Sequence, residues 1–225
     1  TTWLECTSQI KAAGYIGGIG NRYAIAVDEN GGTLVRTPNY GVNENTEIRN
    51  TTAFINSDGH LNAIIKTKYS AEQQDRLHAY INGLSKDKLM EFLKENIELA
   101  TYDVKSFNYQ EDKSVIPVVT ETLDLVADHY ATATGKRLFV VPNIITRAKR
   151  KLTSSEKRKN DIVLDFEFKD IDTTVITIPA AYASEAVPQE VSLKSKFGKY
   201  NASVKVEGNK IIYYRHYEHY SGRFP

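Results

Sequence analysis

The sequence predicts a mainly β, α+β protein, built as a β-sandwich of antiparallel strands with an inserted two-helix segment. Short runs rich in β-branched and aromatic residues recur along the chain, with turn residues between them. Apolar residues at helical spacing are confined to one stretch, near residues 71–97. Fourteen Tyr against eight Phe and one Trp favour sheets whose faces are partly hydrated.

The first 40 residues are rich in Gly and contain one predicted hairpin. Tyr23–Val27 and Thr33–Thr37 have the composition of short strands, and the turn residues Asp28–Gly32 join them. Pro38 and the residues after it then interrupt the pattern. We therefore expect residues 1–40 to form one unit and residues 41–225 to form the β-sandwich domain.

A second hairpin is predicted directly after this break. Its arms are Glu47–Asn56 and His60–Tyr69, and Ser57–Gly59 forms the turn. In the second arm, alternate residues from Leu61 to Thr67 share one face, while Ile64 interrupts the polar pattern of the other face.

The predicted helices lie near 71–83 and 86–97. Ser70 is the expected N-cap of the first, which ends at Gly83. Ser85 is the expected N-cap of the second. The stretch after Leu99 predicts only strands: Tyr102–Tyr109, Val118–Tyr130, Arg137–Val141, Asp161–Phe168, Thr173–Ile178, Glu190–Lys196, Tyr200–Val206 and Lys210–His219. Lys149–Lys159 is predicted to be an exposed loop.

The composition and charge of the chain argue against several classes of function. The formal net charge is +1, so no overall field favours nucleic acid or an anionic membrane. No apolar run reaches the roughly 18 residues of a membrane span. The five His show no metal-ligand spacing, and we expect neither a metal nor a cofactor. The Gly14–Gly20 run lacks the strand, helix and third glycine of a dinucleotide-binding turn.

Two candidate sites follow from the residues alone. Cys6 is the only thiol and could act as a nucleophile, although no base follows it; a buried structural Cys is the favoured reading. In the Tyr-rich tail, alternation places Tyr213, Arg215 and Tyr217 on one side of a strand. Tyr and Arg are frequent anchors at interfaces, so these residues could form a binding strip, although a purely structural role is the favoured interpretation.

The ordered motifs of the chain resemble the region that follows the catalytic core in bacterial transglutaminase-like proteins. The resemblance covers most of the chain. Its landmarks include Trp3–Gln9, Gly14–Gly17, Gly32–Pro38, Gly135–Phe139, Pro179–Tyr182 and Gly222–Pro225.

This resemblance implies a role for Glu5. The family places the acid of a Cys–His–Asp triad in a pattern like W-x-D-x-T, and Trp3, Glu5 and Thr7 occupy the matching positions. Glu5 would therefore hold the triad His in the correct tautomer. Glu in place of Asp is a departure from the family pattern, and its extra methylene would disturb the hydrogen bond to that His. The family's Cys and His have no counterpart in this chain, so residues 1–40 would be the closing strands of that core, or a linker hairpin.

We therefore expect a non-catalytic, C-terminal β-rich accessory region, a fragment of a larger transglutaminase-like protein. It would support or gate the missing upstream core, or bind a protein or peptide partner. The alternative is an independent cell-surface β-sandwich that binds a ligand, peptide or glycan. A self-sufficient cysteine hydrolase using Cys6 is a third hypothesis. By resemblance alone, the protein is expected to be exported to the periplasm or the cell surface.

Overall fold

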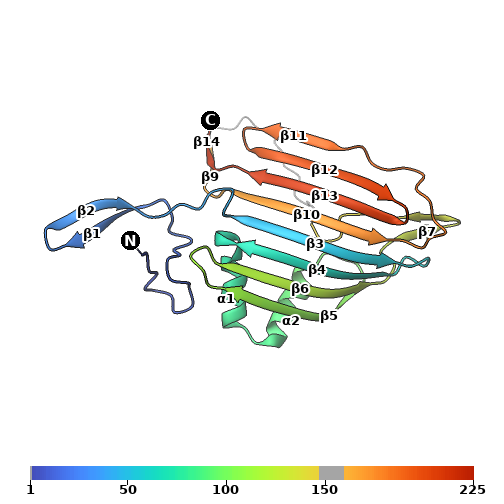
Figure 1. Cartoon of the computed structure of the whole chain (residues 1–225), viewed down its shortest axis with the longest axis horizontal. Helices are drawn as coiled ribbons and strands as arrows, with labels where there is room; N and C mark the ends of the chain where they lie inside the picture. The colour runs from blue at the N-terminus through green and yellow to red at the C-terminus, as the bar shows by residue number, and fades with distance from the viewer. Residues whose placement is uncertain (1, 147–159) are drawn as a thin grey trace.

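The computed structural model describes residues 2–146 and 160–225 and is built on one eight-stranded sheet (Figure 1). The predicted Lys149–Lys159 loop therefore lies entirely outside the described residues. The order of strands in the eight-stranded sheet is β11-β12-β13-β10-β3-β4-β6-β5, and three two-stranded sheets complete the β structure of the described residues. The mainly β prediction, with an inserted pair of helices, is confirmed.

The elements before the midpoint of the chain include both helices. They are β1 (Tyr23–Asp28), β2 (Gly31–Arg36), β3 (Thr46–Ile55), β4 (Leu61–Ser70), the 3-10 turn η1 (Ala71–Gln74), α1 (Asp75–Gly83), α2 (Lys86–Asn96) and β5 (Tyr102–Asp112). The later elements are strands: β6 (Val118–Ala127), β7 (Thr132–Thr134), β8 (Arg137–Phe139), β9 (Ile162–Leu164), β10 (Phe168–Thr177), β11 (Val191–Ser195), β12 (Gly198–Glu207), β13 (Lys210–His219) and β14 (Gly222–Phe224).

The arrangement of the sheet differs from the expected antiparallel sandwich. The large sheet is mixed. β10 and β3 pair in parallel, whereas every other pair of neighbouring strands in this sheet is antiparallel. Two antiparallel groups, β11-β12-β13-β10 and β3-β4-β6-β5, thus meet at one parallel junction. The long connection that the parallel pairing requires explains why local hairpin patterns did not predict it.

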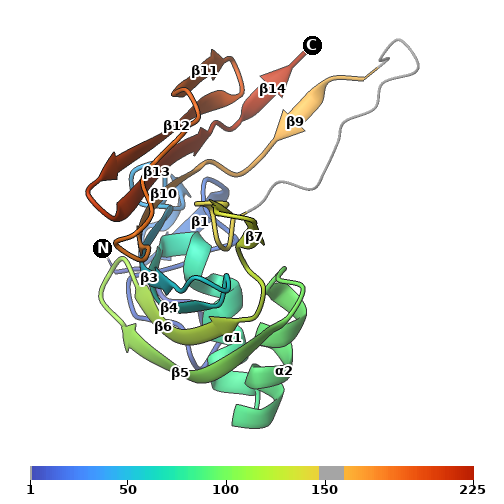
Figure 2. The same ribbon diagram turned by 90° about the vertical axis from the view of Figure 1, so that its right-hand side faces the viewer.

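The core lies on one face of this sheet, and the helices cover part of that face (Figure 2). Burial alternates strictly from Leu61 to Lys68, with Leu61, Ala63 and Ile65 inside. Leu93 and Ile97 of the helical segment pack against the same cluster. The opposite face is solvated, and the exposed Ile64 that interrupted the sequence pattern lies there. The helices thus take the place that a second sheet would hold in a sandwich.

The helical segment confirms one predicted cap and corrects the other. Ser85 caps α2, because its Oγ accepts a hydrogen bond from the backbone N–H of Lys88. Ser70 makes no such bond, so its prediction as an N-cap is wrong. Ala71 instead enters a 3-10 turn with a positive φ of 50°, and α1 begins at Asp75. β4 therefore runs into the helical segment without a capping residue.

Several predicted strands differ from the observed ones. The predicted strand 161–168 is reduced to β9, and β10 begins at Phe168 rather than at Thr173. β6 ends at Ala127, before the predicted end, and His129 follows with a φ of +51°. The short strands β7 and β14 were not predicted. No helix among the described residues is long and apolar enough to cross a membrane.

Candidate functional site

The segment before β1, residues 2–22 and here called the N-terminal segment, is fastened to the side of the sheet that the helices cover. The ring of Tyr15 is fully buried, and its hydroxyl donates to Asp75 Oδ1 at 2.9 Å. Tyr15 also packs against Tyr40, with ring centroids 5.0 Å apart, and both belong to a small cluster with Ala12 and Ala71. Burial and the nearby carboxylate raise the pKa of Tyr15, so its hydroxyl stays protonated and acts as a donor.

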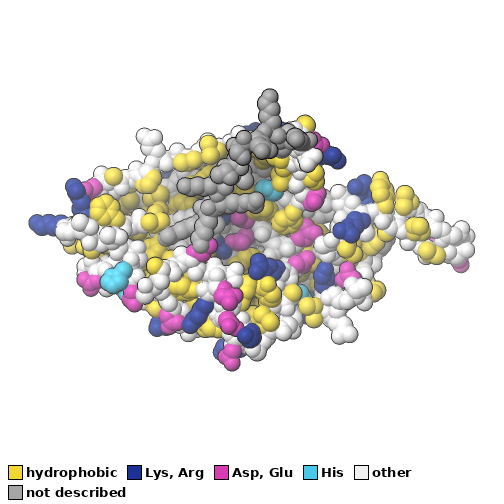
Figure 3. All heavy atoms as spheres, turned by 180° about the vertical axis from the view of Figure 1, so that it is seen from behind, with side chains coloured by type: hydrophobic (Ala, Val, Ile, Leu, Met, Phe, Trp, Pro, Cys, Tyr) yellow, Lys and Arg dark blue, Asp and Glu magenta, His cyan; other side chains and the backbone are white. Residues whose placement is uncertain are grey.

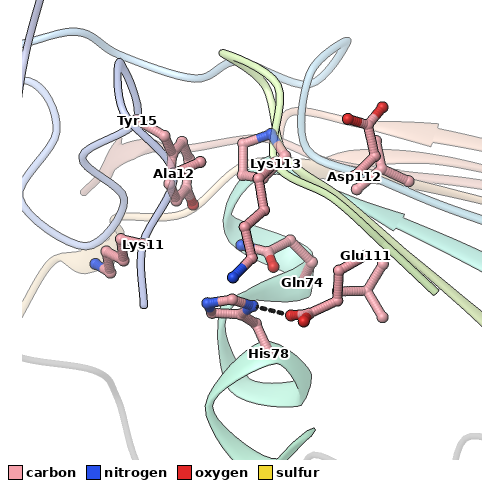
Figure 4. Close-up of a pocket in the computed structure, with 11 residues that line it drawn as sticks. Lys11, Ala12, Tyr15, Gln74, His78, Glu111, Asp112 and Lys113 are labelled. Carbon is pink, nitrogen blue, oxygen red and sulfur yellow. Dashed lines mark hydrogen bonds and ion pairs between the residues drawn. The ribbon is translucent and has the colours of Figure 1, made fainter. Parts of the chain in front are cut away.

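His78 supplies a second attachment, shown in Figure 4. Its imidazole lies between Glu111 of β5 and the N-terminal segment, where Nε2 donates to the carbonyl of Ile10 at 3.1 Å. Its Nδ1 is hydrogen-bonded to the Glu111 carboxylate. These hydrogen bonds of the His78 imidazole link α1, β5 and the N-terminal segment.

Glu5, the predicted acid, lies on this N-terminal segment with its carboxylate held by Thr7. The backbone N–H of Thr7 donates to Glu5 Oε1 at 3.1 Å, and the Thr7 hydroxyl donates to the same oxygen. These two hydrogen bonds, the side-chain bond first, lower the pKa of Glu5. The spacing of Glu5 and Thr7 therefore gives an ionised, oriented carboxylate.

The structure brings no His to Glu5 or to Cys6 within the described residues. Cys6 is exposed, and its thiol contacts the Leu4 carbonyl at 3.9 Å. The hydrogen bonds of His78 go to Glu111, Ile10 and Asn82, and His60 pairs with Asp128. The described residues also contain no group of three or more His, Cys, Asp or Glu side chains placed to hold a metal ion.

The β1–β2 hairpin, residues 23–36 and here called the arm, projects away from the sheet (Figure 1). One face of the arm is apolar and open to solvent, with Tyr23 and Ile25 each 68%, Val27 81% and Leu34 65% exposed. Ile25 and Leu34 are direct cross-strand partners. Figure 3 shows hydrophobic side chains gathered on the projection. At the base of the arm, the Thr37 N–H donates to the Arg22 carbonyl at 2.8 Å and extends the hairpin pairing by one residue pair.

A row of polar residues crosses the helix-covered face of the large sheet. Its members face one another directly across six neighbouring strands, from β13 to β5. They are Arg215, Asp172, Arg49, Thr67, Glu121 and Tyr109. We call this set the charged row.

Paired charges hold the middle of the charged row together. Arg49 donates to Asp172 Oδ1 at 3.1 Å and to Thr67 Oγ1 at 3.2 Å. Arg215 donates to the other oxygen of Asp172 and, at 3.2 Å, to Asp170 Oδ2. Asp172 and both Arg are buried. One carboxylate thus links two guanidinium groups across the parallel junction of β10 and β3.

Glu121 lies further along the charged row, and two tyrosine hydroxyls donate hydrogen bonds to its carboxylate. Tyr69 and Tyr109 donate to its two carboxylate oxygens at 3.3 and 3.0 Å. Burial raises the pKa of Glu121, and the two hydroxyl donors and Arg49 only partly oppose this shift. Burial likewise raises the pKa of Glu47, which pairs with Arg49. A cavity of about 360 Å³ opens beside Glu47, Tyr69 and Glu121, against residues of both helices.

Of the predicted binding strip, only Arg215 belongs to the charged row. Tyr213 and Arg215 are each 6% exposed, so they face the interior of the molecule rather than an open surface. Tyr217 is half-buried and packs against the Phe168 ring at 5.6 Å. The sequence reasoning did not identify Arg49 or Asp172. Charged residues at alternate positions that otherwise face the core are the signal that could have found them.

Comparison with known proteins gives one domain match. Residues 136–225 match the model of a domain of unknown function with a solved structure, DUF3858. The search of curated proteins gives no match. A solved structure of a candidate protease from Parabacteroides distasonis ATCC 8503 is similar, with a TM-score of 0.27 and 9% identity. That match covers 82% of this chain and 37% of the solved chain, so this chain spans little more than a third of it.

Proposed function

We propose that this chain is a non-catalytic accessory region of a transglutaminase-like protein, and that its arm docks onto the upstream core of the same polypeptide. The observation that carries the proposal is the open apolar face of the arm, where four large side chains are each at least 65% exposed. Contiguous exposed apolar surface of this kind marks interaction sites.

The arm is also poorly suited to exist alone. A two-stranded hairpin is marginally stable in water unless further strands or another domain cover it. β1 pairs only with β2 among the described strands, and β2 only with β1, so both outer edges of the arm are unpaired. Unpaired edges and an apolar face would both be satisfied by a neighbouring β-rich domain.

The resemblance to transglutaminase-like proteins supplies the occupant. In that family, the strands that close the catalytic core come directly before the β-rich region, and residues 1–40 would occupy that position. The arm and Glu5 lie in this same stretch, and His78 and Tyr15 fasten it to the sheet. The sheet would then hold the closing strands in place against the core.

Photo-crosslinking in the full gene product tests this docking. A photoreactive residue placed at Val27, on the apolar face, should crosslink to residues encoded before Thr1 in the same gene. The control position is Ala26, which alternation places on the other face of the arm. Crosslinks from Val27 only to another copy, to a different protein or to nothing would contradict the proposal, provided that the Ala26 sample is equally folded.

Glu5 is proposed to complete a Cys–His pair that the core supplies. Its support is the ionised carboxylate that Thr7 orients, together with the resemblance of Trp3, Glu5 and Thr7 to the family pattern. The coding sequence upstream of Thr1 checks this first, because it must encode a Cys followed by a His. A coding sequence without them would exclude this role for Glu5.

The alternative function, an independent cell-surface module for a ligand, peptide or glycan, rests on the Tyr-rich tail and the cavity beside the charged row. A glycan and peptide array would show specific binding if it holds and none if it does not. Export to the periplasm or cell surface also stays a proposal from the resemblance, and fractionation of cells that express the gene product checks it.

A further inference from the structure

A separate cavity of about 520 Å³ lies at the far end of the large sheet from the arm. Its floor is formed by Val204 and Val206 of β12 and Ile211 of β13. The β8 segment and the loop 182–188 form its walls. This volume lies in the range of about 300–1,000 Å³ that is typical of small-molecule sites.

The lining of this cavity is apolar with one polar end. Thirteen of its 17 lining residues have apolar side chains, and the four others are Lys136, Arg137, Ser184 and Glu185. Arg137 Nε lies 2.9 Å from Glu185 Oε2. This ion pair brings the segment of Lys136 and Arg137 next to the segment of Ser184 and Glu185. Polar groups at one end of an apolar cavity orient a ligand that has a head and a tail.

The net charge at the polar end of the cavity indicates which kind of ligand head group fits there. Glu185 compensates Arg137, whereas Lys136 forms no ion pair with any residue that the structure describes. The lining therefore carries a net charge of +1, from two cations and one carboxylate. An anionic head complements this charge, and the aliphatic lining complements an unbranched hydrocarbon chain.

We propose that this cavity binds an aliphatic carboxylate, with its head at Lys136 and its chain against Val204, Val206 and Ile211. The proposal is independent of the docking of the arm, because the cavity and the arm lie at opposite ends of the sheet. It lies within the part of the chain that matches DUF3858.

Titration calorimetry with dodecanoate below its micellar concentration tests the proposal on the full chain. Saturable binding of one dodecanoate per chain is expected, and the absence of saturable binding would overturn the proposal. Val206→Trp fills the floor of the cavity and should weaken binding at least about tenfold. Ala186→Phe fills it from the loop side and should do the same without altering the sheet. Val163→Trp, on an exposed strand elsewhere, should bind as the unchanged chain does.

A separate measurement tests whether Lys136 binds the anionic head of the ligand. Lys136→Glu should weaken dodecanoate binding by up to about fivefold, as expected for an exposed charge pair, and should leave dodecan-1-ol unchanged. Equal effects on both ligands would overturn the anionic head. Circular dichroism establishes that each variant is folded, and a folded Ala186→Phe variant that binds dodecanoate normally would exclude this cavity as the site.

Discussion

At the scale of single residues, Gly17 determines how closely the N-terminal segment approaches α1. A Cβ atom at this position would overlap the Tyr15 hydroxyl and the Asp75 carboxylate, which are hydrogen-bonded to each other. Packing therefore requires a glycine at this position of the glycine-rich run. Its backbone must lie against a buried tyrosine.

Gly17→Ala is expected to loosen the N-terminal segment. The added methyl group must displace Tyr15 or Asp75, and overpacking of a buried site costs roughly 1–3 kcal/mol. Chemical denaturation should show this loss, and hydrogen exchange should quicken around Tyr15. Gly83→Ala is the control, because a Cβ there meets no atom within 4 Å. Equal stability of the two variants would contradict the tight contact at Gly17.

Glu121 gives the charged row a dependence on pH. Its pKa is raised above the ordinary value of 4.5, because burial disfavours the ionised carboxylate in the folded state. The protonated form is therefore favoured by folding. Its contribution to stability is fully present below pH 4.5 and is lost as pH rises through the higher pKa of the folded state.

Glu121→Gln should remove this pH dependence. The unfolding free energy of the unchanged protein, minus that of the variant, should fall as pH rises from 4.5 toward neutrality. Urea denaturation at a series of pH values measures this difference. Glu29→Gln, at the exposed turn of the arm, separates the effect of the buried position from the loss of any carboxylate. A difference that stays constant or rises with pH would contradict the account.

The charged row also shows which residues a sequence can reveal. Arg215 stands out in the sequence because its neighbours in the tail are aromatic, whereas its partner Asp172 lies 43 positions away along the chain. Arg49 and Asp172 are 123 positions apart. Such a contact depends on the register of a parallel strand pair, and no local spacing encodes that register.

At the scale of elements, the two helices differ in how they begin. α2 starts at a capped Ser85, while the preceding helical turn follows Ser70 without a side-chain cap. Ser70 and Ser85 each come directly before a predicted helix, but the backbone conformation after the two serines differs. Ala71 adopts a positive φ and donates its N–H to the Pro117 carbonyl, which ties the turn to the loop before β6.

Ser85→Ala and Ser70→Ala should therefore differ in their effect on stability. Loss of the cap at Ser85 should cost about 1 kcal/mol of unfolding free energy. Ser70→Ala removes no capping bond, and its effect should lie within about 0.5 kcal/mol of zero. Thermal unfolding of the two variants measures both values. A larger loss for Ser70→Ala than for Ser85→Ala would contradict the assigned caps.

The strands were predicted best where hairpins are local. β13 has the predicted bounds, and the turn at Gly208 joins it to β12 as expected. The pattern failed for β9 and β10, because β9 pairs with β14, some 60 residues later, and breaks away from β10. The first half of β10 carries Asp170 and Asp172, which both pair with Arg215, so it lacks the polar and apolar alternation of a half-buried strand.

At the scale of the whole molecule, the charged row joins the two antiparallel groups of the sheet. Asp172 lies at the parallel junction and accepts hydrogen bonds from Arg49 on one side and Arg215 on the other. Thr146 donates to the same carboxylate at 3.3 Å. The junction is therefore held by buried charges as well as by backbone pairing.

Asp172→Asn should destabilise the whole sheet. The amide removes the negative charge between two buried guanidinium groups, and breaking a buried ion pair costs roughly 3–5 kcal/mol. Glu47 and Asp170 also pair with these Arg, which places the expected loss near the lower end. Asp124→Asn, on the opposite face of β6, is the matched control. Chemical denaturation compares the two, and an equal effect would contradict a structural role for the junction.

The apolar face of the arm is not covered by any other element that the structure describes. The sheet covers its core with the helices, and the N-terminal segment is fastened by Tyr15 and His78. The apolar face of the arm has no such cover among the described residues. If an upstream core occupies it, the backbone amides of the arm are held in a larger sheet or interface.

Amide hydrogen exchange of residues 23–36 in the full gene product tests this claim most directly. The account predicts protection of the arm comparable to that of β3 and β4, because a covered hairpin opens only with the domain that covers it. Exchange as fast as that of an unstructured peptide, while β3 and β4 remain protected, would contradict it.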